Sequence, residues 1–144
     1  MKALTLTQPW ATLVAIGAKK LETRSWQTKY RGPLAIHAAK GFPKSAWALI
    51  HQEPFLTPLS AFEPPSGWGD LDPVPTGCII AVVGIVACYH ILHLDDHGDD
   101  KYGGLVPPRE PELSFGDYGP GRYVWVLQNP QLIATPIPCK GALG

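Results

Sequence analysis

A run of apolar, mostly β-branched residues near the middle of the chain places the strongest constraint on its fold. Residues 78–90, CIIAVVGIVACYH, are rich in Val and Ile and contain no Asp, Glu, Lys or Arg. The run is too short to cross a membrane as a helix, and Gly84 and His90 interrupt it. We therefore predict a long central strand with a bulge at Gly84, against which the other strands of a sheet would pair.

The rest of the chain shows the patterns of short strands and short helices joined by two long loops. Alternating residues predict strands at 3–7, 19–26 and 34–39, and a hairpin formed by 122–127 and 132–138 around Asn-Pro-Gln. Helices are expected from Pro9 to Gly17 and within 40–51. A proline-rich segment (about 53–76) and an acidic segment (about 94–117) are expected to be loops. Together these patterns predict one α+β domain over 1–144, a small closed β-barrel of mixed, mostly antiparallel strands with peripheral short helices.

Charge is distributed very unevenly, although the formal net charge of the whole chain is zero. Residues 1–52 contain eight Lys and Arg against the single acid Glu22, whereas 53–117 contain eleven Asp and Glu against two basic residues. Such segregation can create a local positive surface on a neutral protein. The basic part is therefore where we expect an anionic ligand, unless the two parts pair with each other in the fold.

The stretch KKLETRSW, residues 19–26, places the isolated acid Glu22 among cations. On a strand Lys20, Glu22, Arg24 and Trp26 would share one face, and Lys19 would stand at its start. Cations and an aromatic ring are what a nucleotide phosphate and base require, and a carboxylate can accept from a base amino group or take a proton. The structural alternative is that Glu22 and Arg24 only pair while Trp26 fills the core.

Further candidates lie close to the predicted strand ends. They are Gln8 and Trp10 at the first helix, Arg31, His37 and Lys40 in and around the strand at 34–39, and Arg122 and Tyr123 at the start of the hairpin. His37 could act as an acid or base near neutral pH, although a histidine on a strand face more often makes a structural hydrogen bond. Gln8 could likewise cap the helix, and Trp10 could pack in the core.

Metal and cofactor chemistry has little support in the sequence. The stretch HILHLDDHGDD (90–100) is rich in His and Asp, but His90 and His93 would fall on opposite faces of a strand, so a solvated acidic loop is expected. No phosphate-binding loop or dinucleotide glycine fingerprint occurs. We expect no metal, no cofactor and no membrane segment, and the absence of a signal-peptide pattern after Lys2 suggests a cytoplasmic protein.

Three ordered blocks resemble the ASCH domain, a family named for its homology to a transcriptional coactivator. They are QPWA at 8–11, the pattern G-x-K-x-x-E-x-R-S-W at 17–26, and R-G-x-L-x-I at 31–36. The likeness continues through PTGCIIAVV (75–83), RYVWVLQNPQ (122–131) and PIPCKGALG (136–144). The resemblance implies a PUA-like β-barrel, a fold widely used to bind RNA.

The resemblance also implies possible catalysis. Some members of the family are similar to ribonucleases, and a divergent branch is similar to amidohydrolases that act on N4-acetylcytidine nucleosides. That branch uses a Lys, a Thr three residues later and a distant Glu. Lys19 matches the Lys, Glu22 stands where the Thr would be, and Glu110 and Glu112 are candidates for the distant Glu.

The main hypothesis is therefore a protein that binds RNA or a nucleotide, with DNA as another possible ligand, through a basic cleft. Its binding residues would be Gln8, Trp10, Lys19, Lys20, Glu22, Arg24, Trp26, Arg31, Lys40, Arg122 and Tyr123. A first alternative is a metal-independent hydrolase, a ribonuclease or a nucleoside amidohydrolase, with Lys19, Glu22 and His37 as catalytic residues. A second alternative is a protein-interaction module that uses the proline-rich segment.

Overall fold

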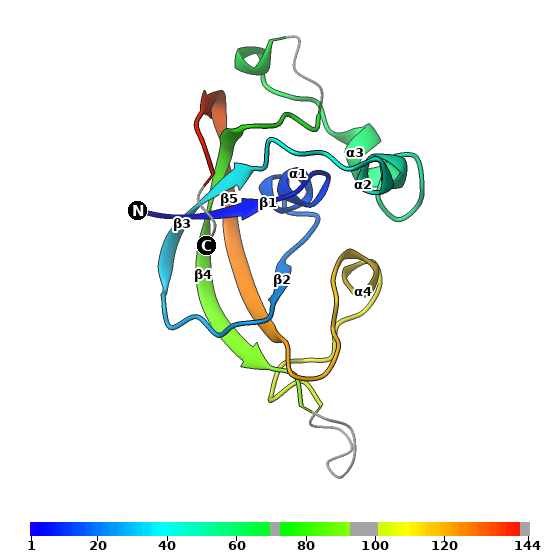
Figure 1. Cartoon of the computed structure of the whole chain (residues 1–144), viewed down its shortest axis with the longest axis vertical. Helices are drawn as coiled ribbons and strands as arrows, with labels where there is room; N and C mark the ends of the chain where they lie inside the picture. The colour runs from blue at the N-terminus through cyan, green and yellow to red at the C-terminus, as the bar shows by residue number, and fades with distance from the viewer. Residues whose placement is uncertain (70–72, 93–100, 142–144) are drawn as a thin grey trace.

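The computed structural model describes residues 1–69, 73–92 and 101–141, which form a strongly curled sheet with short helices around it (Figure 1). The strands are β1 (Lys2–Leu6), β2 (Leu21–Arg24), β3 (Gly32–Ala38), β4 (Cys78–His90) and β5 (Tyr123–Pro138). The helices are α1 (Trp10–Ala15), α2 (Lys44–Leu49), α3 (Leu56–Ala61) and α4 (Glu112–Phe115), with a 3-10 helix, η1, at Ser66–Trp68. The predicted α+β class with short peripheral helices is confirmed.

The sheet has the strand order β1-β3-β4-β5-β2. β1 runs parallel to β3, and the other neighbouring strands are antiparallel, so the sheet is mixed and mostly antiparallel as expected. Within the described residues no strand pairing joins β1 to β2, so the sheet is not seen to close into the expected barrel. β1 and β2 are instead its two edges.

The central strand is formed as predicted. β4 pairs with β5 along its whole length and with β3 from Cys78 to Ile85. Its register against β5 shifts at three places, one of them between Val82 and Gly84, where the bulge was expected. Leu34, Ile36 and Ala38 of the neighbouring strand β3 are buried in the same core cluster as β4.

The predicted hairpin at the end of the chain is wrong, because residues 123–138 form one strand. Leu127 pairs with Ile85 of β4, and Leu132 pairs with Ala81 further along the same partner. Asn129, at a φ of 51°, and Pro130 resemble a turn in sequence, but here they are accommodated by a register shift. Long-range pairing with β4 therefore overrides the local turn signal.

The prediction of an irregular proline-rich segment is also wrong in part, because the segment contains α3 and η1. Pro58 is the third residue of α3, where a backbone N–H would have no partner within the helix in any case. Trp68 is only 1% exposed, and its indole N–H donates to the Ile133 carbonyl over 2.8 Å. A Cβ on Gly67 would clash with the Ala134 carbonyl oxygen, so η1 packs directly on the backbone of β5.

The acidic segment, predicted to be a loop, contains α4 near its end. Phe115 of α4 is 2% exposed, and its ring centroid lies 5.1 Å from that of Phe55. Leu13 of α1 packs in the same cluster, whereas its neighbour Val14 packs against the sheet. The short α1, which ends before Gly17 at a φ of 79°, thus joins the sheet to the surrounding helices.

In the described part of the chain, no helix has both the length and the apolar character that a membrane crossing requires. Residues 93–100, which carry most of the His- and Asp-rich stretch, lie outside the described residues.

Candidate functional site

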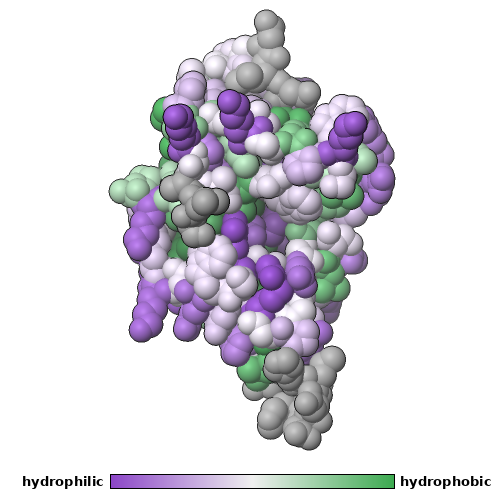
Figure 2. Space-filling model, viewed as in Figure 1, coloured by the Kyte–Doolittle hydropathy of each residue, from purple (hydrophilic) through white to green (hydrophobic). Residues whose placement is uncertain are grey.

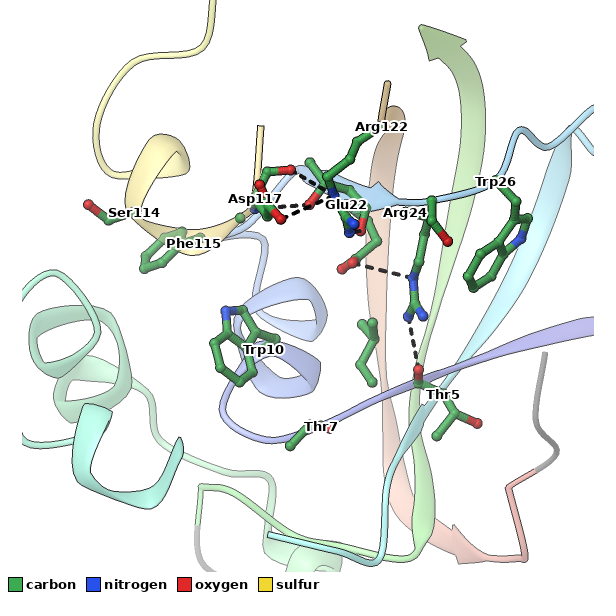
Figure 3. A pocket seen from close by; sticks show the side chains of 14 residues that line it. Thr5, Thr7, Trp10, Glu22, Arg24, Trp26, Ser114, Phe115, Asp117 and Arg122 are labelled. Carbon is green, nitrogen blue, oxygen red and sulfur yellow. Dashed lines mark hydrogen bonds and ion pairs between the residues drawn. The ribbon is translucent and has the colours of Figure 1, made fainter. Parts of the chain in front are cut away.

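A cleft of about 510 Å³ lies between the two edges of the sheet and the α4 region (Figure 3). We call it the edge cleft. Its lining comes from the end of β1 and the residues after it, from α1, from β2 and the residues after it, and from the segment that begins with α4. These residues are Thr5, Leu6, Thr7, Trp10, Glu22, Thr23, Arg24, Ser25, Trp26, Ser114, Phe115, Gly116, Asp117 and Arg122.

Arg24 bridges the two sheet edges at the bottom of this cleft. Its Nη2 donates to the Thr5 carbonyl of β1 over 3.0 Å, so a side chain of β2 links strands that are not paired to each other. The Arg24 guanidinium carbon also lies 5.2 Å from the ring centroid of Trp26, in cation–π range. Figure 3 shows the guanidinium between the Glu22 carboxylate and the Trp26 ring, above the Thr5 carbonyl.

Glu22 is held between two cations. Its Oε1 lies 3.4 Å from Arg24 Nε, and its Oε2 lies 3.5 Å from Lys19 Nζ. Glu22 is 8% exposed and Lys19 only 2%, and the Lys19 ammonium also donates to the Leu21 carbonyl. Two cations against one carboxylate give this cluster a formal charge of +1, but Lys19 does not line the cleft. The charged residues that do line it, Glu22, Arg24, Asp117 and Arg122, sum to zero, so the cleft as a whole is not the basic cleft that the sequence predicted.

The segment from Glu112 to Asp117, which we call the α4 wall, forms the opposite side of the cleft. It meets the free edge of β2, where a further strand could otherwise pair. Glu112 Oε1 accepts from the Lys20 amide over 2.6 Å, and the Asp117 amide donates to Thr23 Oγ1 over 3.1 Å. Arg122 Nη2 adds a hydrogen bond to the Thr23 carbonyl, also at 3.1 Å. Two backbone groups along this edge, the Lys20 amide and the Thr23 carbonyl, are therefore bonded to side chains.

Two ionisable groups at the α4 wall, Glu112 within it and Tyr118 directly after it, have shifted pKa values. Burial raises the pKa of Glu112, and the Lys20 amide and the Lys19 charge partly oppose that shift. Burial also raises the pKa of Tyr118 above its ordinary value, with the nearby carboxylates of Glu112 and Glu22 adding to the effect. The Tyr118 hydroxyl and Glu112 Oε2 are buried without a hydrogen-bond partner. Tyr118 is thus a neutral phenol at physiological pH.

The structure brings five of the sequence-predicted binding residues into the edge cleft: Trp10, Glu22, Arg24, Trp26 and Arg122. Lys19 stands behind Glu22 and, with the exposed Lys20, lines a separate cavity of about 270 Å³. The predicted shared face of Lys20 and Glu22 is therefore not found. β2 ends at Arg24, so Trp26 reaches the cleft from beyond the strand.

Gln8 and His37 are buried and have structural partners. Gln8 accepts from the Thr12 amide over 3.0 Å and donates to the Pro75 carbonyl over 2.8 Å, which matches the capping role considered for it. His37 is 3% exposed, and its ring nitrogens lie 3.2 Å from Thr5 Oγ1 and 3.0 Å from the Cys139 carbonyl. Neither residue lines the edge cleft.

The remaining candidates lie elsewhere. Arg31 is exposed and donates to the carbonyls of its own loop. Lys40 lines a different cavity together with Lys140. Tyr123 stacks on His90, with ring centroids 4.5 Å apart. Of the two candidates for the distant Glu, Glu112 reaches the Lys20 amide and Glu110 accepts from Ser114 Oγ over 2.6 Å.

Several cleft residues were missed by sequence reasoning, above all Thr5, Thr7, Ser114, Phe115 and Asp117. Asp117 belongs to the glycine-rich stretch GDYGPGR, which indicates only a turn. Thr23 was expected on the face opposite Glu22, yet it also lines the cleft, because the cleft wraps around the free edge of β2. No local pattern signals that residues more than 90 positions apart in sequence form the two sides of one site.

A metal centre finds no support in the described residues, since no three His, Cys, Asp or Glu side chains gather there in a suitable arrangement. The most tempting stretch for such a site falls largely in residues 93–100, outside the described part of the chain.

Most of the chain matches a known protein family. Residues 4–114 match the family model described as the ASCH domain. Activating signal cointegrator 1 from Mus musculus is 28% identical over 139 residues, which cover 96% of this chain and 20% of the relative. The Homo sapiens protein of the same name is 27% identical over 139 residues, with the same coverage. The chain thus spans about a fifth of the length of these curated relatives.

Proposed function

The chain belongs to the ASCH domain family, and from that premise we propose that it binds RNA, or a nucleotide derived from it, in the edge cleft. ASCH domains are PUA-like domains generally linked to RNA binding. The proposal applies that general property to one cleft and names the residues that would carry it.

One observation carries the proposal: the Arg24 guanidinium lies beside the Trp26 ring, 5.2 Å from its centroid, inside a cleft. A guanidinium offers a planar fork of N–H donors for a phosphate, and an indole offers a face on which a base can stack. Trp26 is 38% exposed, so part of its ring is accessible. Glu22 then stands where a carboxylate could accept from a base amino group.

The arrangement of the sheet supports the same proposal. We propose that residues 1–144 are one domain of the PUA-like barrel type, with the edge cleft at the opening where β1 and β2 would otherwise meet. Arg24 already bridges these two edges through the Thr5 carbonyl. A ligand that contacts Arg24 would therefore bind where the two edges are linked.

The experiment is a fluorescence anisotropy titration of the full chain with labelled single-stranded RNA and DNA of the same sequence at low salt. We expect RNA to bind more tightly than DNA, and Arg24→Ala to weaken RNA binding about tenfold or more, the loss of one charge-assisted contact. Lys44→Ala is the matched control, because Lys44 is an exposed cation on α2 that does not line the cleft. Trp26→Leu tests the stacking face without removing charge.

Undetectable RNA binding, or equal binding by wild type and both cleft variants, would refute the proposal. Thermal unfolding of each variant separates lost binding from lost folding. Raising the salt concentration should weaken binding, because phosphate contacts release counterions.

A second candidate function is metal-independent hydrolysis, favoured by the Glu22 carboxylate placed between Lys19 and Arg24 at the cleft. Such a carboxylate could act as a general base while the cations stabilise negative charge that develops on the substrate. Incubation with labelled RNA and with N4-acetylcytidine in EDTA tests this candidate. Turnover that disappears in Glu22→Gln supports it; no turnover, or turnover that survives the substitution, excludes it.

A further inference from the structure

A second, smaller cavity adjoins the edge cleft. We call it the aromatic pocket; it has a volume of about 230 Å³ and its walls include Trp26, Tyr30 and Trp125. Its size suits one planar ring system and falls below that of a pocket for a drug-sized ligand. Trp26 lines both cavities, so one indole separates them. A ligand that passes over Trp26 would reach from one cavity into the other.

The rings of the aromatic pocket are fixed in place by the protein. Trp26 and Trp125 meet edge to face, with centroids 5.9 Å apart and planes at 85°. The Trp125 indole N–H donates to the Trp26 carbonyl over 3.3 Å, and the Tyr30 hydroxyl donates to the Pro33 carbonyl. Rings that are already fixed lose little conformational entropy when a base stacks on them. Buried Ile85 supplies an apolar floor.

The rim of the aromatic pocket is basic. Lys2 lines the pocket, and its ammonium lies 5.2 Å from the Tyr30 ring centroid. Lys29 and Arg31 flank Tyr30 in sequence and are exposed, and Arg31 Nη1 braces the loop by donating to the Thr28 and Tyr30 carbonyls over 3.1 and 2.9 Å. Hydrophilic side chains gather over the β2–β3 connection and the start of β1, at the lower left of Figure 2.

This charge matches a phosphate backbone. Glu22 is the single acid in residues 1–52, and it is 8% exposed and engaged with Lys19 and Arg24. Around the aromatic pocket the N-terminal part of the chain therefore presents cations to the solvent. Aromatic faces surrounded by cations are typical of sites that hold single-stranded nucleic acid.

We propose that the aromatic pocket is a second base subsite, so that the protein takes a single-stranded oligonucleotide of at least two nucleotides. The inference rests on the proposed function: the first nucleotide occupies the edge cleft beside Arg24, the chain crosses Trp26, and the next base enters between Tyr30 and Trp125. Lys2, Lys29 and Arg31 then neutralise the phosphates at the rim. This geometry gives Arg31, which lies outside the edge cleft, a role in binding.

The test compares two sets of ligands on the full chain by isothermal titration calorimetry. One is the set of four ribonucleoside 5′-monophosphates, and the other is the set of 5′-phosphorylated dinucleotides with the same base twice. For at least one base we expect the dinucleotide to bind about tenfold more tightly or better, as stacking of one additional base predicts. Tyr30→Ala should remove that advantage and leave the affinity for the monophosphate unchanged.

Ala3→Trp is the second variant, because Ala3 is an exposed residue of β1 that lines the aromatic pocket, and a large ring there would fill it. It should abolish the dinucleotide advantage without removing any aromatic wall. Lys44→Ala, outside both cavities, is the control.

The outcomes distinguish the two proposals. Binding of monophosphate and dinucleotide with equal affinity, or a dinucleotide advantage that survives both Tyr30→Ala and Ala3→Trp, overturns the second subsite and leaves the edge cleft intact. Loss of both ligands in Arg24→Ala, together with selective loss of the dinucleotide advantage in the other two variants, supports both sites. Failure of every nucleotide to bind overturns the proposed function and the subsite with it.

Discussion

The two sides of the edge cleft carry ion pairs of almost the same length in opposite surroundings. On the β2 side Lys19 Nζ lies 3.5 Å from Glu22, and the two side chains are 1% and 10% exposed. On the α4 wall Arg122 Nε lies 3.6 Å from Asp117, with the side chains 30% and 71% exposed. Since the distances match, burial decides what each pair contributes. We therefore expect substitutions on the β2 side to lower the stability of the protein strongly, and substitutions on the α4 wall to lower it little.

The variant with the largest expected effect is Lys19→Met, which keeps most of the side-chain volume and leaves Glu22 with Arg24 as its remaining cation. We expect the free energy of unfolding to fall by about 3 kcal/mol, the lower end of the cost of breaking a buried pair, because Arg24 still compensates part of the Glu22 charge. Urea unfolding measures it, and Lys20→Met, at the exposed neighbouring lysine, is the control. A loss below about 1 kcal/mol would mean that the buried pair contributes no more to stability than the exposed one.

Arg24→Lys should have the next largest effect. Lysine keeps the positive charge beside Glu22 but lacks the planar fork that reaches the Thr5 carbonyl and the Trp26 ring. We expect a loss of about 1.5–2 kcal/mol in the free energy of unfolding, the contribution of a hydrogen bond to a charged group. If thermal and urea unfolding of this variant matched those of wild type, the bridge between the sheet edges would be unimportant for stability.

The pH dependence of the stability of Glu112→Gln tests how burial acts on the α4 wall. Because burial raises the pKa of Glu112, its contribution to stability is fully present below the ordinary carboxyl pKa and is lost as pH rises through the folded-state pKa. The amide keeps an acceptor for the Lys20 N–H but has no charge to desolvate. The stability of the variant relative to wild type should therefore increase from about pH 4 to about pH 8, by less than either preceding effect. A difference that is independent of pH would contradict this assignment.

Asp117→Asn should have the smallest effect. The Asp117 backbone bonds to Thr23 and Arg122 do not need the carboxylate, and an Asn oxygen can still accept from the Gly119 amide, now 2.9 Å from Oδ1. We expect the free energy of unfolding to change by less than about 1 kcal/mol, as for other exposed pairs. A loss similar to that of Lys19→Met would show that the α4 wall is as rigid as β2.

The same contrast explains which features the sequence could predict. Glu22 and Arg24 are two residues apart on one strand, so alternation alone placed them together, and the long run at 78–90 predicted its own strand. Asp117 and Phe115 reach the cleft because α4 packs against Phe55, and no local pattern encodes that contact. Similarly, Asn129-Pro130 has the sequence of a turn, but the strand that contains it pairs with β4. His37 has the chemistry of an acid or base, but it is buried, and the sequence does not show that burial.

The central claim, that the edge cleft is the ligand site, is tested most directly by NMR of the tryptophan indole N–H groups during titration with single-stranded RNA. Trp10 and Trp26 line the cleft, whereas Trp47 is exposed on α2 and Trp68 is buried against β5. We predict that the indole signals of Trp10 and Trp26 shift in proportion to bound RNA while those of Trp47 and Trp68 stay in place. A shift of the Trp47 signal with Trp10 and Trp26 unchanged would contradict the claim.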